Sequence, residues 1–215
     1  MSTRTSISIS VRRHFVDDFF FCNAGLLISK TSKVIDIGGH KGAKRGLFDV
    51  EKFSNSVMYV NIDETKSDIA ADASSIPESD SSYDVAIMGE LLEHVPEPLT
   101  AVKEAYRLLK PDGILIATVP FMFPIHPDPF DYGRYTDMFW KKLAKDVGFS
   151  RVEIQQQGTA FAVAALMVQH LFLAKKVSWR PIQYPLVAFL MWLDKKTSAP
   201  LLKNWTTGFG LIFKK

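Results

Sequence analysis

The sequence contains a single cysteine, Cys22, among 215 residues. One thiol cannot build an internal disulfide framework or a cysteine-rich zinc site, and its isolation favours a reducing, cytoplasmic location. The net charge is only +3, from 26 basic and 23 acidic residues. Because no long basic run is present, nucleic acid is not an expected partner. No stretch of about 20 apolar residues runs without polar interruption, so a membrane-spanning helix is not expected either.

Short apolar segments are the most regular feature of the chain. They are rich in Val and Ile, as strands covered on both faces of a sheet are. We expect strands at 34–37, 57–62, 83–88, 114–119, 152–154 and 208–213. Apolar residues at helical spacing predict helices at 97–110 and 136–147. This alternation predicts an α/β fold with a doubly wound, mostly parallel sheet and helices on both faces.

The first predicted strand ends in a glycine loop that contains Asp36, Gly38 and Gly42. The dinucleotide pattern G-x-G-x-x-G fails here, because His40 and Ala43 occupy its second and third glycine positions. The phosphate-binding pattern G-x-x-x-x-G-K-[ST] fails as well. What remains is acidic-x-G-x-x-x-G, a backbone turn that can lie close to a ligand without cradling a phosphate.

Six segments occur in an order and at distances that resemble a known family. They are VIDIGG at 34–39, NID at 61–63, ADASSIP at 71–77, YDVA at 83–86, LEHV at 92–95 and RLLKPDG at 107–113. Together they resemble the class I S-adenosylmethionine-dependent methyltransferases of the small-molecule, type 11-like group, over roughly residues 33–154. The resemblance implies a Rossmann-like seven-stranded sheet, S-adenosylmethionine as cofactor and S-adenosylhomocysteine as product. The sequence departs from the family at His40, where glycine is usual.

The resemblance and the chemistry of the strand ends imply the same cofactor site. Asp63 lies 25 residues after Gly38 and can accept hydrogen bonds from both ribose hydroxyls. Its neighbour Glu64 is the alternative. Asp72 can accept from the adenine amino group, and the backbone N–H of Ala73 can reach a ring nitrogen.

The glycine loop and the end of the third predicted strand complete the expected cofactor site. Gly38, Gly39 and Gly42 allow the backbone to approach the ligand. Asp36 either orders this loop or meets the ammonium group of the cofactor. Glu90 either faces the methionine portion or caps the helix that follows.

Residues after the fourth predicted strand are the candidates for the acceptor side. A hydroxyl acceptor needs a base, and His126 or His94 could serve as one, although a lone histidine is more often structural. The loop with His126 resembles a stretch of glycan-pathway methyltransferases. Asp131, Arg134 and Tyr135 could therefore hold acceptor hydroxyls or a phosphate, or the charged pair could only shape the loop. Acidic residues and histidines near the cleft could bind a metal, but no ligand spacing stands out and no metal ligand is assigned.

We expect one methyltransferase domain over residues 1–215. It comprises an N-terminal helical segment (1–32), a cofactor-binding core (33–157), a helical insertion (158–207) and a closing strand (208–215). The insertion is apolar and must be covered by something. It could form a lid over the acceptor site, a homodimer contact, or a peripheral membrane contact for a lipid-linked acceptor.

The function hypothesis is transfer of a methyl group to a small acceptor, a hydroxyl of a sugar, of a glycan precursor or of another metabolite. The motif Asn/Asp-Pro-Pro-Tyr is absent after 83–88, which argues against methylation of a nucleic-acid base. The alternative is a non-catalytic protein on the same scaffold that binds a membrane surface or a partner. His40 and the apolar insertion are the features that suggest it.

Overall fold

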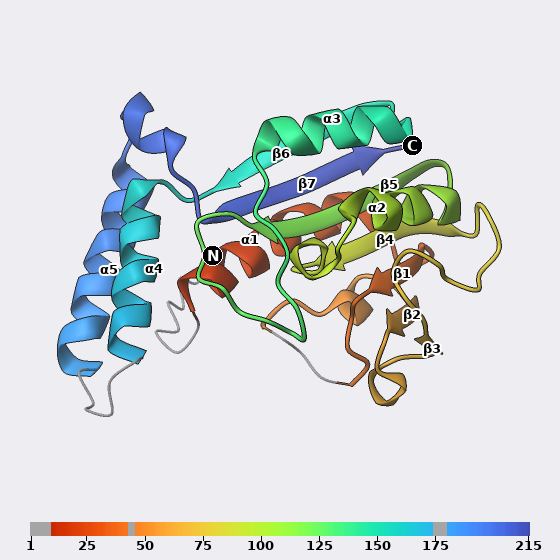
Figure 1. The fold of residues 1–215 in the computed structure, drawn as a ribbon, viewed down its shortest axis with the longest axis horizontal. Coiled ribbons are helices and arrows are strands. Elements are labelled where there is room, and N and C mark those ends of the chain that lie inside the picture. The colour runs from red at the N-terminus through yellow and green to blue at the C-terminus, as the bar shows by residue number, and fades with distance from the viewer. Residues whose placement is uncertain (1–9, 43–45, 174–179) are drawn as a thin grey trace.

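The computed structural model describes residues 10–42, 46–173 and 180–215. Its centre is a seven-stranded sheet in the order β3-β2-β1-β4-β5-β7-β6 (Figure 1). The strands are β1 (Lys33–Ile37), β2 (Ser56–Asn61), β3 (Ile69–Ala70), β4 (Tyr83–Gly89), β5 (Leu109–Pro120), β6 (Arg151–Gln157) and β7 (Gly208–Lys214). Strand β7 is antiparallel to both neighbours, whereas β1 to β5 pair in parallel. The expected Rossmann-like sheet is confirmed.

Helices cover both faces of this sheet. Helix α1 (Val11–Leu27) covers one face, and α2 (Pro98–Leu108) and α3 (Asp137–Val147) cover the other. Helices α4 (Ala160–Leu173) and α5 (Arg180–Lys196) follow β6 in the chain. Ser10 caps α1, because its side chain accepts a hydrogen bond from the N–H of Arg13. Gly148 ends α3 in the left-handed conformation, with φ of 110°. Residues 1–9 of the expected N-terminal segment lie outside the described residues.

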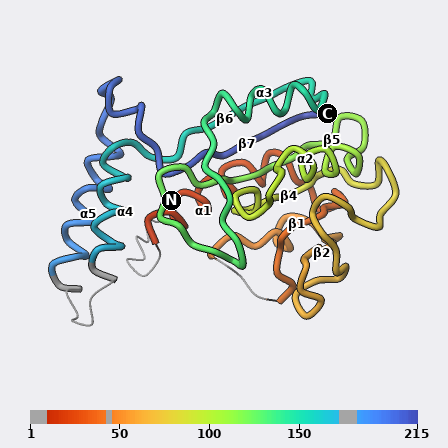
Figure 2. The backbone as a smooth tube through the Cα atoms, viewed as in Figure 1, coloured from red at the N-terminus to blue at the C-terminus, as the bar shows by residue number. Residues whose placement is uncertain are grey.

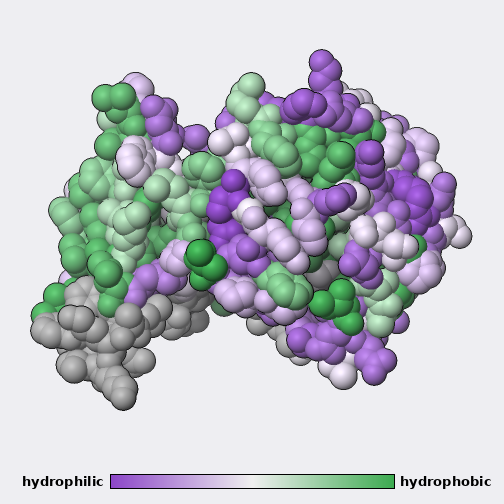
Figure 3. All heavy atoms as spheres, in the orientation of Figure 1, coloured by the Kyte–Doolittle hydropathy of each residue, from purple (hydrophilic) through white to green (hydrophobic). Residues whose placement is uncertain are grey.

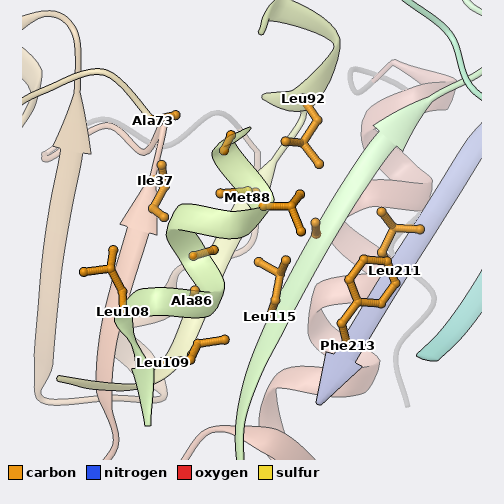
Figure 4. Packing of buried hydrophobic residues seen from close by; sticks show 14 of the residues in the cluster. Ile37, Ala73, Ala86, Met88, Leu92, Leu108, Leu109, Leu115, Leu211 and Phe213 are labelled. Atoms are coloured by element: carbon orange, nitrogen blue, oxygen red, sulfur yellow. The ribbon is translucent and has the colours of Figure 1, made fainter. Parts of the chain in front are cut away.

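Alternate residues of each central strand enter different cores. Ala86 and Met88 of β4 pack on the face that α2 and α3 cover, whereas Val85 and Ile87 pack against α1. Figure 4 shows side chains from β1, β4, β5 and β7 that meet on the α2 side. Because both faces are buried at the centre of the sheet, β1 and β4 are apolar along most of their length, which is why the sequence pattern identified them, whereas β6 also carries polar residues.

Helices α4 and α5 form a pair that extends from one end of the sheet (Figures 1 and 2). The Asp194 carboxylate of α5 accepts hydrogen bonds from the N–H groups of Thr159 (2.7 Å) and Ala162 (3.0 Å), at the start of α4. Leu166 of α4 is buried against Val11 of α1, which attaches the pair to the domain. Residues 174–179 of the expected insertion lie outside the described part of the chain. Within that part, no helix combines the length and apolarity that crossing a membrane requires.

A buried ion pair joins α1 to the sheet. The Arg12 guanidinium donates to both oxygens of Glu90, at 2.8 and 2.6 Å, and their side chains are only 4% and 12% exposed. Arg12 also donates to the side chain of Gln157, at the end of β6. The absence of a side chain at Gly208 leaves room for the Arg12 guanidinium, since a Cβ there would lie 2.4 Å from it. One arginine therefore connects α1 with the ends of three strands.

Replacing Arg12 with methionine should lower the free energy of unfolding by about 3–5 kcal/mol, because Glu90 would stay buried without its cation. In the double variant Arg12→Met/Glu90→Gln, the loss should be smaller than the sum of the two single losses. Urea unfolding followed by circular dichroism measures all three. Lys142→Met, which breaks an exposed pair with Asp146, is the control and should change stability little. Additive losses at Arg12 and Glu90 would contradict the importance of the pair.

Candidate functional site

A cavity of about 430 Å³ opens at the carboxyl ends of β1, β2 and β4. This larger cavity has the size that a nucleoside-containing ligand requires. Six of its lining residues are ones that the sequence singled out: Gly38, Asp63, Asp72, Ala73, Glu90 and His94. The parallel arrangement of the strands is the reason that these distant residues meet, because it brings their carboxyl ends to one edge of the sheet.

Asp63 and Asp72 each organise a turn and still face the larger cavity. One oxygen of Asp63 accepts from the N–H (3.0 Å) and the hydroxyl (2.7 Å) of Thr65, and the other pairs with Lys66 at 2.9 Å. The hydrogen bonds from Thr65 and Lys66 lower the pKa of Asp63 to about 2, so the carboxylate is ionised at neutral pH. Oδ1 of Asp72 accepts from the N–H and the hydroxyl of Ser74, and no hydrogen bond from another described residue is directed at Oδ2. Both residues therefore retain acceptor capacity.

The glycine loop needs its glycines for steric reasons. Gly38 has φ of 80°, and a Cβ there would lie 2.8 Å from the side chain of Leu91. A Cβ at Gly39 would lie 2.4 Å from the carboxyl carbon of Asp36. Asn61, which sequence reasoning did not assign to the site, donates to the carbonyl oxygens of Gly38 and Gly39. The end of β2 thus fixes the loop after β1.

Part of the glycine loop borders a second, smaller cavity of about 160 Å³ under α1. Asp36, Gly39, His40 and Gly42 line this smaller cavity, and Gly38 lines both. Burial raises the pKa of Asp36 to about 7. The loop residues expected to hold one cofactor are therefore divided between two cavities, with Gly38 at the boundary.

Glu90 is committed to a contact that the sequence did not indicate. Although burial opposes it, the Arg12 guanidinium holds the pKa of Glu90 below its usual value. Glu90 has φ of 54°, a left-handed conformation that costs strain outside glycine. It borders the larger cavity, yet its carboxylate is directed by Arg12. The short turn at Leu92–His94 has no side-chain cap, so Glu90 does not cap it.

Two histidines from different loops meet around a buried glutamate. The rings of His94 and His126 lie 5.0 Å apart, and Nε2 of each lies near Oε1 of Glu93, at 3.7 and 3.9 Å. Burial, together with the Glu90 carboxylate, raises the pKa of Glu93 well above its usual value. Burial lowers the pKa of His126, which favours the neutral imidazole. We refer to Glu93, His94 and His126 as the histidine cluster.

The residues expected to bind the acceptor hold the His126 loop together. Arg134 donates to both oxygens of Asp131, at 2.5 and 2.7 Å, and the N–H of His126 donates to Asp131 at 2.9 Å. Tyr135 stacks on Phe139 with ring centroids 4.1 Å apart and packs against the core. None of the three lines the larger cavity, where Phe130 and Tyr132 of the same loop do. The aromatic residues that follow β5 in the sequence could have indicated that Phe130 and Tyr132 line a ligand site.

Comparison with known proteins gives a consistent family. A model of a methyltransferase domain matches residues 36–117. A demethylmenaquinone methyltransferase of Staphylococcus epidermidis is 35% identical over 118 residues. This match covers 50% of the present chain and 46% of the relative, so the chain spans about half the length of the curated relatives that it matches.

Solved structures support the same fold. A SAM-dependent methyltransferase from Archaeoglobus fulgidus superposes with a TM-score of 0.59 at 17% identity, covering 94% of both chains. Phosphoethanolamine N-methyltransferase 2 of Haemonchus contortus, in complex with S-adenosyl-L-methionine, gives 0.57 at 14% identity over 98% of this chain and 58% of that one. The [4+2]-cyclase SpnF gives 0.59 at 16% identity over 99% and 85%. At these identities the likeness establishes the fold and not the reaction.

Asp36→Asn should stabilise the protein above pH 7. The folded state raises the pKa of Asp36 from 3.8 to about 7, so ionised Asp36 favours unfolding by at most about 4 kcal/mol. This cost begins near pH 4 and is complete above pH 7, and the advantage of the asparagine variant should follow the same course. Thermal unfolding across this pH range measures it. Asp68→Asn is the control of opposite sign, because Lys41 lowers the pKa of Asp68. Equal stability of Asp36→Asn and wild type at pH 8 would contradict the assignment.

Proposed function

Because the chain belongs to the class I S-adenosylmethionine-dependent methyltransferases, we propose that it transfers a methyl group from S-adenosylmethionine to a hydroxyl of a small acceptor. A sugar, a glycan precursor or another hydroxylated metabolite fits this role. One observation carries the proposal. Two acidic residues that follow strands, Asp63 and Asp72, line the larger cavity together with His94 of the histidine cluster.

The residues at the strand ends fit the nucleoside half of the cofactor. Asp63 is ionised and can accept from the ribose hydroxyls, and the unused oxygen of Asp72 can accept from the adenine amino group. Leu91 packs on Gly38 at a distance that only glycine permits. Because Gly38 also lines the larger cavity, the backbone of the loop is close to a ligand bound there. When bound, the cofactor supplies a methyl group already activated on a sulfonium.

The histidine cluster fits the acceptor side. A hydroxyl becomes a good nucleophile when its proton is removed, and alignment with the donor supplies much of the remaining acceleration. His94 lines the larger cavity, and the ring of His126, which is not among the lining residues, lies 5.0 Å from the ring of His94. We assign His126 and His94 as the catalytic residues that assist loss of this proton. Asp131 and Arg134 act as positioning residues, since they fix the loop that carries His126.

Substitutions of Asp63 and His126 should affect different quantities, cofactor affinity and turnover. Asp63→Ala should weaken binding of S-adenosylhomocysteine about 10- to 100-fold, because at least one charge-assisted hydrogen bond of about 1.5–3 kcal/mol is lost. Glu64→Ala, next to it but exposed and outside the cavity lining, should not. His126→Ala should lower turnover by about 10²–10⁴-fold with unchanged affinity for S-adenosylhomocysteine.

Calorimetry with S-adenosylhomocysteine, and S-adenosylhomocysteine release during turnover of hydroxylated acceptors, measure the two effects. Equal losses for Asp63→Ala and Glu64→Ala would refute the ribose assignment. Cofactor binding without any methyl transfer would favour the alternative function, a binding protein on this scaffold. The similarity to a [4+2]-cyclase is one of fold alone and does not decide between the two functions.

The insertion of residues 158–207 has an apolar outer surface. Figure 3 shows hydrophobic residues gathered over α4 and α5. Ile182, Phe189 and Trp192 of α5 are each more than half exposed and lie on one face by their helical spacing, and Leu171 of α4 is 68% exposed. No residue of either helix lines the larger cavity among the described residues, which argues against a closed lid. We propose that this surface forms a homodimer contact.

Sedimentation equilibrium at micromolar concentration should give a dimer, and Leu171→Glu with Phe189→Glu should give a monomer. Leu26→Glu, at an even more exposed apolar residue on α1, should leave the dimer intact. A monomeric wild type that binds liposomes, and loses this binding in the double variant, would instead support a peripheral membrane contact and a lipid-linked acceptor.

A further inference from the structure

The buried charges around the larger cavity do not balance. Arg12 pairs with Glu90, and Arg134 pairs with Asp131. Glu93 lies between these pairs and is 2% exposed, and neither of its carboxylate oxygens has a hydrogen-bond partner within the described chain. A carboxylate without a partner is costly to bury. Glu93 is therefore the acid that lacks a cation.

The two histidines direct lone pairs toward this acid. Nδ1 of His94 lies 2.5 Å from the carbonyl oxygen of Phe130. A carbonyl can only accept, so Nδ1 carries a proton, and in the neutral imidazole Nε2 is the nitrogen that keeps a lone pair. That Nε2 is the atom that lies 3.7 Å from Glu93.

His126 follows the same pattern. Its Nδ1 lies 3.2 Å from the carbonyl oxygen of Pro124 and 3.4 Å from Asp131. Arg134 Nη2 is also near, at 3.3 Å, but its two hydrogens already have acceptors in Asp131 and Pro124. Nδ1 of His126 therefore carries a proton, and its Nε2 faces Glu93 with a lone pair.

One carboxyl oxygen and two imidazole nitrogens converge here, and they form the donor set of a metal site once Glu93 has lost its proton. We propose that the carboxylate of Glu93 and the Nε2 atoms of His94 and His126 bind a divalent transition-metal ion. All three ligand atoms lie within 4.8 Å of one another, and ligands about 2.1 Å from a shared ion are at most about 4.2 Å apart, so a small contraction closes the site.

The surroundings resemble those of known metal sites. A metal-binding imidazole typically donates its other N–H to a backbone carbonyl or a carboxylate, as both histidines do here. Two imidazoles and one carboxylate favour Zn²⁺, Co²⁺, Mn²⁺ or Fe²⁺ over Mg²⁺ and Ca²⁺. Three protein ligands leave coordination positions open, and His94 borders the larger cavity, so a ligand in the cavity can reach the ion.

This site deepens the proposed function and rests on it for its catalytic role. A metal ion lowers the pKa of a coordinated hydroxyl. The proton of the acceptor hydroxyl would leave to solvent, and its oxygen would form the new bond to the methyl carbon. The methyl–sulfur bond would break, with its electron pair kept by sulfur. His94 and His126 would then assist loss of the proton as ligands and not as direct bases.

Metal binding can be measured without cofactor or acceptor. Chelator-treated protein titrated with Co²⁺ should develop the visible absorption of a bound ion at one ion per chain. Glu93→Gln, His94→Ala and His126→Ala should each weaken binding by at least about 100-fold, because loss of a second-shell partner alone costs 10–100-fold. His14→Ala, in α1 and outside the cluster, should bind as the wild type does. Circular dichroism checks that each variant is folded.

Absence of Co²⁺ or Zn²⁺ binding by the wild type, or binding that is equal in the three cluster variants, would overturn the proposal. If Glu93→Gln does not fold, the two histidine variants decide, because their side chains lie on loops. Binding of S-adenosylhomocysteine to metal-free protein is measured in parallel. Its presence without metal binding refutes the metal site alone, and its absence refutes the proposed function. Methyl transfer that is abolished by chelator and restored by the ion supports the catalytic role, whereas chelator-insensitive transfer refutes it.

Discussion

The ion pair between Arg12 and Glu90 is the contact on which the arrangement of the site depends. It fixes α1 across the ends of β4 and β6, and other residues of the same helix line the smaller cavity. It also provides the cation that is hydrogen-bonded to Glu90, a residue whose backbone is held in a left-handed conformation. The turn that follows Glu90 carries Glu93 and His94, so the position of the histidine cluster is set by the same contact.

Local sequence predicted the sheet because both of its faces are covered. The strands read as continuous apolar runs, and the acids after β2 and β3, Asp63 and Asp72, meet in the larger cavity as parallel topology requires. Strand β3 was not predicted, since its two residues, Ile69–Ala70, are too few for any periodicity. The N-terminal helix was expected only as a segment, because apolar and charged residues are distributed around α1 without a clear stripe.

Contacts between distant segments could not be predicted from the sequence. Nothing near Arg12 indicates that it will meet Glu90, 78 residues away, and nothing near Glu93 indicates that it will be buried between two histidines. Both follow from tertiary packing. The Asp131–Arg134 pair lies three residues apart and was weighed from the sequence as a contact that shapes the loop. The geometry agrees with that alternative, because both oxygens of Asp131 are occupied by Arg134.

The insertion enters the fold at a place where it leaves the sheet undisturbed. Strands β6 and β7 are antiparallel neighbours, and the carbonyl of Gln157 accepts from both the N–H (3.1 Å) and the hydroxyl (2.7 Å) of Thr207. These bonds close the base of the connection, so a helix pair of any length can be accommodated beyond it. The pair still reaches the site, because Phe123 contacts His126 on one side and His170 of α4 on the other, with ring centroids 4.8 and 5.4 Å apart. A change in how α4 packs would therefore alter the surroundings of His126 while the strand ends that face the larger cavity stayed in place.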